Sequence, residues 1–194
     1  TGSVTDANSS PYGKFAFTRD TELSGLSFLI KNASLFSIDS LVTQITGSGT
    51  KIINTDFRNE ATVALTPDII VSGDFEDIGN ISGSGKITLN GSSTVGKAAQ
   101  TFIPSASSTY TEIVINKATT DSVTFDSSVN LSASKITITK NGTTTFSGAV
   151  TISNFSDAAD AGNINFNAGG TITSATIFNT TGDVTFSGTN ALDF

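Results

Sequence analysis

The chain has 194 residues, a formal net charge of −7 and a sequence pI of about 4.3, and its 10 basic residues are scattered singly. An acidic chain without Lys and Arg clusters is not built to hold nucleic-acid phosphates, so we expect no nucleic-acid partner. The absence of Cys excludes disulfides and thiolate metal sites, and the absence of His removes the commonest general base and metal ligand.

Residues 1–13 are polar and rich in turn formers, which predicts a flexible N-terminal tail. No run of apolar residues approaches the 18 that a membrane-spanning helix needs, so we expect no membrane insertion of this segment. The chain begins at Thr1 and stops part-way through a repeat unit, which we interpret as a fragment of a longer protein.

Residues 14–45 differ from the rest of the chain and are expected to form N-terminal strands or a cap. The stretches Phe15–Phe17 and Leu26–Ile30 are typical of strands. Two interpretations of the apolar residues that follow remain open. Spacings of 3, 4 and 3 fit one face of an amphipathic helix, whereas the β-branched and hydroxyl residues around them favour two strands separated at Asp39-Ser40. These residues are Leu35, Ile38, Val42 and Ile45.

A repeat organises residues 46–194 and is clearest after residue 121. Four Phe residues follow one another at steps of 21, 20 and 20, and two further columns keep the same step. The Phe column is Phe125, Phe146, Phe166 and Phe186. The other two columns are Val129, Val150, Gly170 and Asn190, and Leu131, Ile152, Ile172 and Leu192.

This repeat predicts an all-β, right-handed single-stranded parallel β-helix with about 20–24 residues per turn. Apolar and polar residues alternate within each unit, so each strand is expected to have one buried face and one solvent-exposed face. Stacked turns would place the Phe rings on one another in a dry core. A β-sandwich is the alternative fold, but it does not predict so constant a step.

Two stretches interrupt the pattern and are expected to be loops. Residues 98–109 contain Pro104 and several Ser, and residues 157–162 form a polar corner. Binding through such loops is the usual arrangement when a rigid scaffold carries them.

Three groups of residues could carry chemistry, but each has a simpler explanation. Asn54-Thr-Asp56 matches a short motif of the polygalacturonases, which also need paired Asp and a His-Gly that this chain lacks. The acidic stretch from Asp74 to Asp77 is interpreted as an outer loop, because nothing marks a cleft with two facing carboxylates. Asp157, Asp160 and Asp183 could bind calcium through oxygen atoms, but no calcium-binding repeat surrounds them.

The outward residues between the core positions form a column of their own. Thr124, Thr145, Asn165 and Thr185 resemble part of an ice-binding array, although the flanking columns mix Ser, Asn and Asp. The column is equally typical of a water-facing β-sheet. Several Asn-x-Ser/Thr triplets, such as the one at Asn141, are expected by chance in so Ser- and Thr-rich a chain.

The sequence around three of the repeats resembles the repeats of large bacterial surface proteins. The segments are 146–152, 162–172 and 182–188, and the similarity covers about residues 80–194. It is to filamentous-haemagglutinin-like exoproteins and autotransporter passengers. That resemblance implies a right-handed parallel β-helix, export across an outer membrane, and a role as an adhesin or stalk. It assigns no functional residue.

Taken together, these features predict a non-catalytic structural or adhesive segment of a secreted bacterial cell-surface protein. We expect no catalytic residue, metal or cofactor, and the implied partners are a host-surface protein or glycan and the neighbouring repeats of the parent chain. The alternative is a carbohydrate-binding or carbohydrate-active β-helix, with Tyr12 and Tyr110 as stacking platforms. A phage fibre or an ice-binding solenoid is a third, weaker hypothesis.

Overall fold

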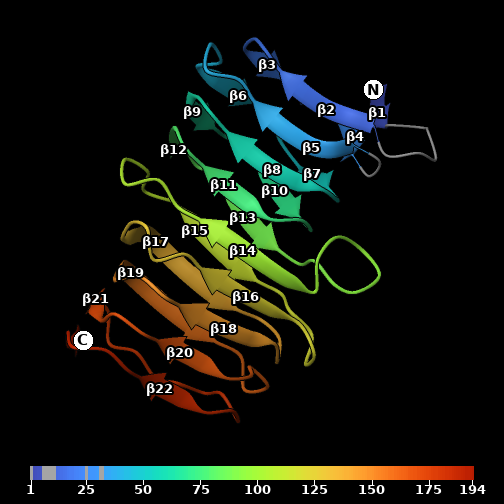
Figure 1. Cartoon of the computed structure of the whole chain (residues 1–194). Coiled ribbons are helices and arrows are strands. Elements are labelled where there is room, and N and C mark those ends of the chain that lie inside the picture. The colour runs from blue at the N-terminus through green and yellow to red at the C-terminus, as the bar shows by residue number, and fades with distance from the viewer. Residues whose placement is uncertain (1, 6–11, 25, 31–32) are drawn as a thin grey trace.

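The chain folds as a β-solenoid in a computed structural model that describes residues 2–5, 12–24, 26–30 and 33–194. The described residues contain 23 strands and no helix, and every strand pair is parallel. Figure 1 shows the strands stacked turn upon turn from the N-terminal to the C-terminal end. The predicted parallel β-helix is therefore confirmed, and the β-sandwich alternative is wrong. No described helix is long and apolar enough to cross a membrane.

Three parallel sheets line the solenoid. Sheet A contains ten strands and sheet B nine, which gives about nine turns, while sheet C contains four. In stacking order, sheet A is β1 (Gly2–Thr5), β4 (Leu26–Ile30), β7 (Thr50–Ile53), β10 (Asp68–Val71), β13 (Lys86–Leu89), β15 (Glu112–Ile115), β17 (Leu131–Ile138), β19 (Val150–Asp157), β21 (Gly170–Ile172) and β23 (Leu192–Asp193). Sheet B is β2 (Tyr12–Phe17), β5 (Ala33–Ile38), β8 (Asp56–Asn59), β11 (Phe75–Asp77), β14 (Ala99–Ile103), β16 (Ser122–Phe125), β18 (Thr143–Phe146), β20 (Ile164–Phe166) and β22 (Val184–Phe186). Sheet C is β3 (Thr21–Glu22), β6 (Gln44–Thr46), β9 (Thr62–Leu65) and β12 (Asn80–Ser82).

The stretch predicted as either a helix or two strands forms strands. Ala33–Ile38 is β5 of sheet B, and Gln44–Thr46 is β6 of sheet C. The strands of residues 14–45 therefore pair within the same sheets as those that follow. Residues 1 and 6–11 of the predicted tail lie outside the described residues, whereas Gly2–Thr5 pairs with β4.

A ladder of nine Phe residues runs along the inner face of sheet B, one on each strand. Neighbouring ring centroids are 4.5–5.8 Å apart, and all pairs except Phe102–Phe125 are close to parallel. The Phe ladder is Phe15, Phe36, Phe57, Phe75, Phe102, Phe125, Phe146, Phe166 and Phe186. Parallel pairing at one register forces equivalent side chains onto the same line, which explains the stacking.

The prediction that four Phe side chains share a dry core is right for three of them. Phe125, Phe146 and Phe166 are at most 1% exposed. Phe186 keeps the register and stacks on Phe166 at 5.6 Å, but it is 53% exposed. No further turn among the described residues covers its other side.

The two other predicted columns are right at their middle steps and wrong at their outer steps. The confirmed pairs are Val150–Gly170 and Ile152–Ile172. Both outer steps are shifted by two residues, and the observed pairs are Leu131–Val150 and Gly170–Leu192. A shift of two residues keeps each side chain on its face of the sheet, so only the corners must absorb the difference.

The loop predicted over residues 98–109 is wrong for its first half. Ala99–Ile103 forms β14, because Phe102 takes its place in the Phe ladder. Two loops flank this strand, one over residues 90–98 and one over residues 104–111. Pro104 ends β14, since it has no N–H for a ladder hydrogen bond. Figure 1 shows the 90–98 loop as the large green loop on the right, between β13 and β14.

Candidate functional site

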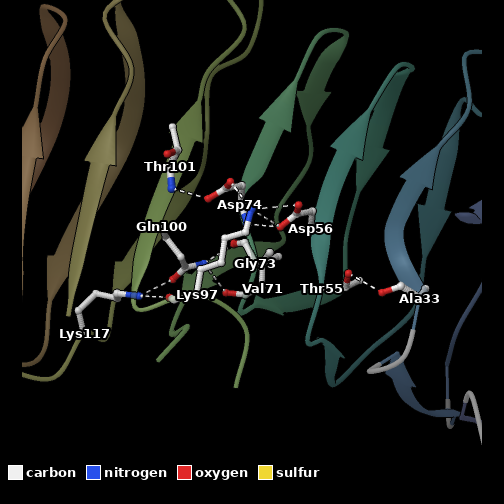
Figure 2. Close-up of polar contacts among 10 residues, drawn as sticks. All are labelled: Ala33, Thr55, Asp56, Val71, Gly73, Asp74, Lys97, Gln100, Thr101 and Lys117. Carbon is white, nitrogen blue, oxygen red and sulfur yellow. Dashed lines mark hydrogen bonds and ion pairs between the residues drawn. The ribbon is translucent and has the colours of Figure 1, made fainter. Parts of the chain in front are cut away.

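A polar cluster lies at the corner between sheets A and B, on three successive turns. Lys97 Nζ lies 3.0 Å from Asp56 Oδ1 and 2.6 Å from Asp74 Oδ2. Partial burial disfavours the charged form of Lys97, but the hydrogen bonds to Asp74 and Asp56 outweigh this and raise its pKa. Figure 2 shows the two carboxylates on neighbouring strands with the lysine between them.

Both carboxylates also hold the backbone of the next turn. The N–H of Asp74 donates to Asp56 Oδ1 at 2.8 Å, and the N–H of Thr101 donates to Asp74 Oδ1 at 2.7 Å. The carboxylates therefore act as links between turns. All four oxygen atoms of the two carboxylates accept a hydrogen bond within the chain.

A buried lysine and a buried amide lie beneath this cluster. Lys117 Nζ donates to Gln100 Oε1 at 3.0 Å, to the carbonyl oxygen of Lys97 at 2.9 Å, and to that of Gly91. Gln100 Oε1 also accepts the N–H of Gly91 at 2.8 Å, and Gln100 Nε2 donates to Val71 O at 3.0 Å. One ammonium group thus ties both stems of the 90–98 loop to the core. Figure 2 shows its contacts with Lys97 and Gln100.

Burial lowers the pKa of Lys117 to about 8, against the opposing attraction of Asp121 and Asp74. The side chain of Lys117 is fully buried and that of Asp121 is 5% exposed. The ammonium group is therefore shielded from solvent, and three oxygen atoms accept its hydrogen bonds.

The polygalacturonase-like triplet is part of the scaffold. Asn54 Oδ1 accepts the hydroxyl of Ser72 at 3.1 Å, and Thr55 Oγ1 donates to Ala33 O at 2.7 Å. Asp56 belongs to the Lys97 cluster. All three residues therefore connect neighbouring turns.

The acidic stretch predicted as an outer loop is a strand, and this prediction is wrong. Phe75–Asp77 is β11, so its side chains alternate between the two faces of sheet B. Glu76 faces outward and lies 3.6 Å from Arg58, whereas Asp77 faces inward and is 2% exposed.

Asp77 is the centre of a second, fully buried network. Its carboxylate accepts Asn59 Nδ2 at 2.8 Å, Ser108 Oγ at 2.5 Å and Tyr110 Oη at 2.8 Å. Ser108 and Tyr110 belong to the 104–111 loop, which takes the place of a sheet C strand in its turn. The network therefore anchors that loop to the core.

Tyr110 cannot act as the predicted stacking platform, because its side chain is 2% exposed. Burial, followed by the charge of Asp77, raises the pKa of its hydroxyl far above the ordinary value. The side chain of Tyr12 lies outside the described residues.

The three candidate calcium ligands do not come together. Asp157 is 7% exposed and accepts the N–H of Asn179 at 2.8 Å, while Asp160 and Asp183 are exposed. No group of three or more acidic residues in the described chain is arranged to hold a metal ion. The corner over residues 157–162 therefore has buried residues, Asp157 and Ala161, beside exposed ones such as Asp160.

The outward Thr and Asn column is confirmed in its register. Thr124 pairs with Thr145, Thr145 with Asn165, and Asn165 with Thr185. Asn165 Nδ2 donates to Thr145 Oγ1 at 3.3 Å, so part of the column bonds to itself.

Sequence reasoning missed Lys97, Gln100 and Lys117. One usable signal was Gln100, which stands two residues before a ladder Phe, where other turns carry Val123 or Ile164. A polar residue at an inward position predicts a buried hydrogen-bond network, because an unpaired one is costly. The lysines gave no such signal.

Comparisons with protein-family models, with curated proteins and with solved structures find no match to this chain.

Proposed function

We propose that the chain is a structural and adhesive segment of a secreted bacterial cell-surface protein and has no catalytic activity. The observation that carries this proposal is the unbroken Phe ladder across nine strands. Such a column resists bending and twisting because each ring packs on the next, as a spacer requires. The polar groups at the corners support the same role, since they link turns to one another.

The adhesive element in this proposal is the 90–98 loop. Its stems are tied to the core by Lys117, so the loop is presented by a rigid support. Val95 is 42% exposed within it. A rigidly held loop with an exposed apolar side chain loses little entropy when it binds a partner.

The implied partner is a host-surface protein or a glycan. The burial of Tyr110 removes one of the two aromatic platforms on which the carbohydrate-binding alternative depended. We therefore favour a protein partner that contacts Val95, with a glycan as the other outcome of the test.

Beads coated with the protein test the proposal by their adhesion to epithelial cells. We expect Val95→Asp to reduce adhesion about ten-fold or more, because a ten-fold loss of affinity corresponds roughly to the loss of one interface contact. Ile78→Asp is the matched control, because Ile78 is 52% exposed and lies outside the loop. Equal adhesion of the wild type and Val95→Asp would overturn the loop assignment, and no adhesion by the wild type would overturn the adhesive function. A loss that enzymatic removal of cell-surface glycans reproduces would identify a glycan partner.

A further inference from the structure

Two Asn-Gly dipeptides lie at the corner between sheets A and B, at Asn90-Gly91 and Asn141-Gly142. Asn-Gly is the dipeptide in which the backbone nitrogen most easily reaches the side-chain carbonyl carbon, because Gly has no Cβ to obstruct it. The two dipeptides have the same chemistry but different surroundings.

The first dipeptide is held at both reacting groups. Asn90 Oδ1 accepts the hydroxyl of Ser72 at 2.9 Å, which fixes the carboxamide. The N–H of Gly91 donates to the buried Gln100 Oε1 at 2.8 Å. Gln100 is itself held by Lys117, so attack by Gly91 requires a buried network to open.

The second dipeptide is held at only one reacting group. The N–H of Gly142 donates to Lys117 O at 2.8 Å. The side chain of Asn141 is exposed and has no hydrogen-bond partner among the described residues. It lines an open surface groove with Thr119, Asn163 and Thr181, so water reaches it freely.

We propose that Asn141 is a site of spontaneous deamidation and that Asn90 is protected by the fold. The nitrogen of Gly142 bonds to Cγ of Asn141, the Cγ–Nδ2 bond breaks, and ammonia leaves with the proton from Gly142. Water then opens the resulting succinimide at either carbonyl carbon. The products are aspartate, with the backbone unchanged, and isoaspartate, in which the backbone passes through the side-chain carbon.

The isoaspartate product alters the stacking of the solenoid, because the corner has no room for a longer backbone. A Cβ on Gly142 would lie 2.5 Å from Lys117 Cβ, and one on Gly162 would lie 2.3 Å from Asn141 O. The turns on both sides therefore already contact this corner closely. An extra backbone carbon there must displace one of them.

The test follows both dipeptides in the same sample of wild-type protein, by peptide mapping with mass spectrometry during incubation in mildly alkaline buffer. We expect deamidation at Asn141 to be at least about ten-fold faster than at Asn90, since at least one more hydrogen bond must open at Asn90. In concentrated urea the two rates should agree within about two-fold, because the unfolded chain retains no protection. Equal rates in the folded protein, or no reaction at Asn141 while both sites react in urea, would overturn the proposal.

Two variants separate the effect of charge from that of backbone length. Asn141→Asp adds the charge alone, and we expect its melting temperature to match that of the fresh wild type. Aged wild type enriched in isoaspartate should melt at a lower temperature, and Asn141→Gln should not change on ageing. An aged protein that melts like the fresh one would overturn the predicted structural consequence.

Discussion

The turns from β2 to β15 and the turns from β16 to β23 share one Phe ladder but differ in how their corners are closed. Ladder Phe residues are 18 to 27 residues apart in the first region, and 20 or 21 apart in the second. Among the described residues, six ion pairs join residues of the first region, and a seventh joins Glu112 of β15 to Lys135 of β17. Residues 141–194 contain no Lys or Arg.

This difference shows that two kinds of interaction hold the same fold. Turns of constant length repeat one corner and need little beyond stacking. Turns of unequal length leave buried backbone groups at their corners, and side chains must satisfy those groups. Lys117, Gln100 and Asp77 do so in the first region. The Phe ladder is therefore the common stabilising element, and the polar networks are local additions to it.

The largest expected effect tests the shared ladder in both regions. Phe57→Asp and Phe166→Asp should each lower the free energy of unfolding by about 4 kcal/mol or more, because each puts an unpaired charge into an apolar column. Urea denaturation measures the change. Thr145→Asp, on the outward face, should change the free energy by less than about 0.5 kcal/mol. Phe186→Asp should fall between these values, since Phe186 is 53% exposed. A large cost in one region only would mean that the ladder is not common to both.

The second prediction concerns the polar network that only the first region contains. Asp77→Ala removes the acceptor of Asn59, Ser108 and Tyr110, and we expect it to cost about 3 kcal/mol. Glu76→Ala, one residue away on the outward face, should cost less than about 1 kcal/mol. Thermal unfolding compares the two variants. Similar costs would show that the buried network adds nothing to stability.

The third prediction uses pH to isolate Lys117. Its pKa is about 8 in the folded chain and 10.5 in the unfolded chain. Above pH 8 the folded chain loses this proton while the unfolded chain keeps it, so stability rises with pH. Between pH 8 and about 9.5, below the ionisation of Tyr110 in the unfolded chain, the free energy of unfolding should rise by about 1–2 kcal/mol. Lys117→Met should abolish this rise, and a rise that persists in the variant would assign it to another group.

The smallest expected effect lies in the second region. Thr144 is fully buried, and its hydroxyl has no partner among the described residues. It stands in an inward column between Val123 and Ile164. Thr144→Val should therefore raise the free energy of unfolding by about 1 kcal/mol, as measured by urea denaturation. Thr145→Val, on the outward face, should not stabilise the protein, and a gain there as large as that at Thr144 would contradict the predicted cause.

Sequence reasoning succeeded where the turns are regular. The constant step from Phe125 onward predicted the fold, the four C-terminal members of the ladder and the outward Thr column, because stacked turns of equal length bring equivalent residues into register, whereas a β-sandwich does not require so constant a step. Phe75 and Phe102 were missed, since their steps of 18 and 27 residues hide the period. Phe15, Phe36 and Phe57 were also missed, although they keep a step of 21 residues. The candidate site was missed for a related reason. Lys97 and Lys117 are 20 residues apart and meet only because one corner lies over another.

The regular step of Phe125, Phe146, Phe166 and Phe186 was enough to predict parallel stacked turns, because residues at one step are buried together when the turns lie on one another. Which residues face each other between turns follows only from the folded chain. Corners can gain or lose residues at little entropic cost, so the pairing of one strand with the next is settled by contacts across the turns. That is why Asp77 faces the core beside Tyr110, although the sequence around it is typical of an exposed acidic loop.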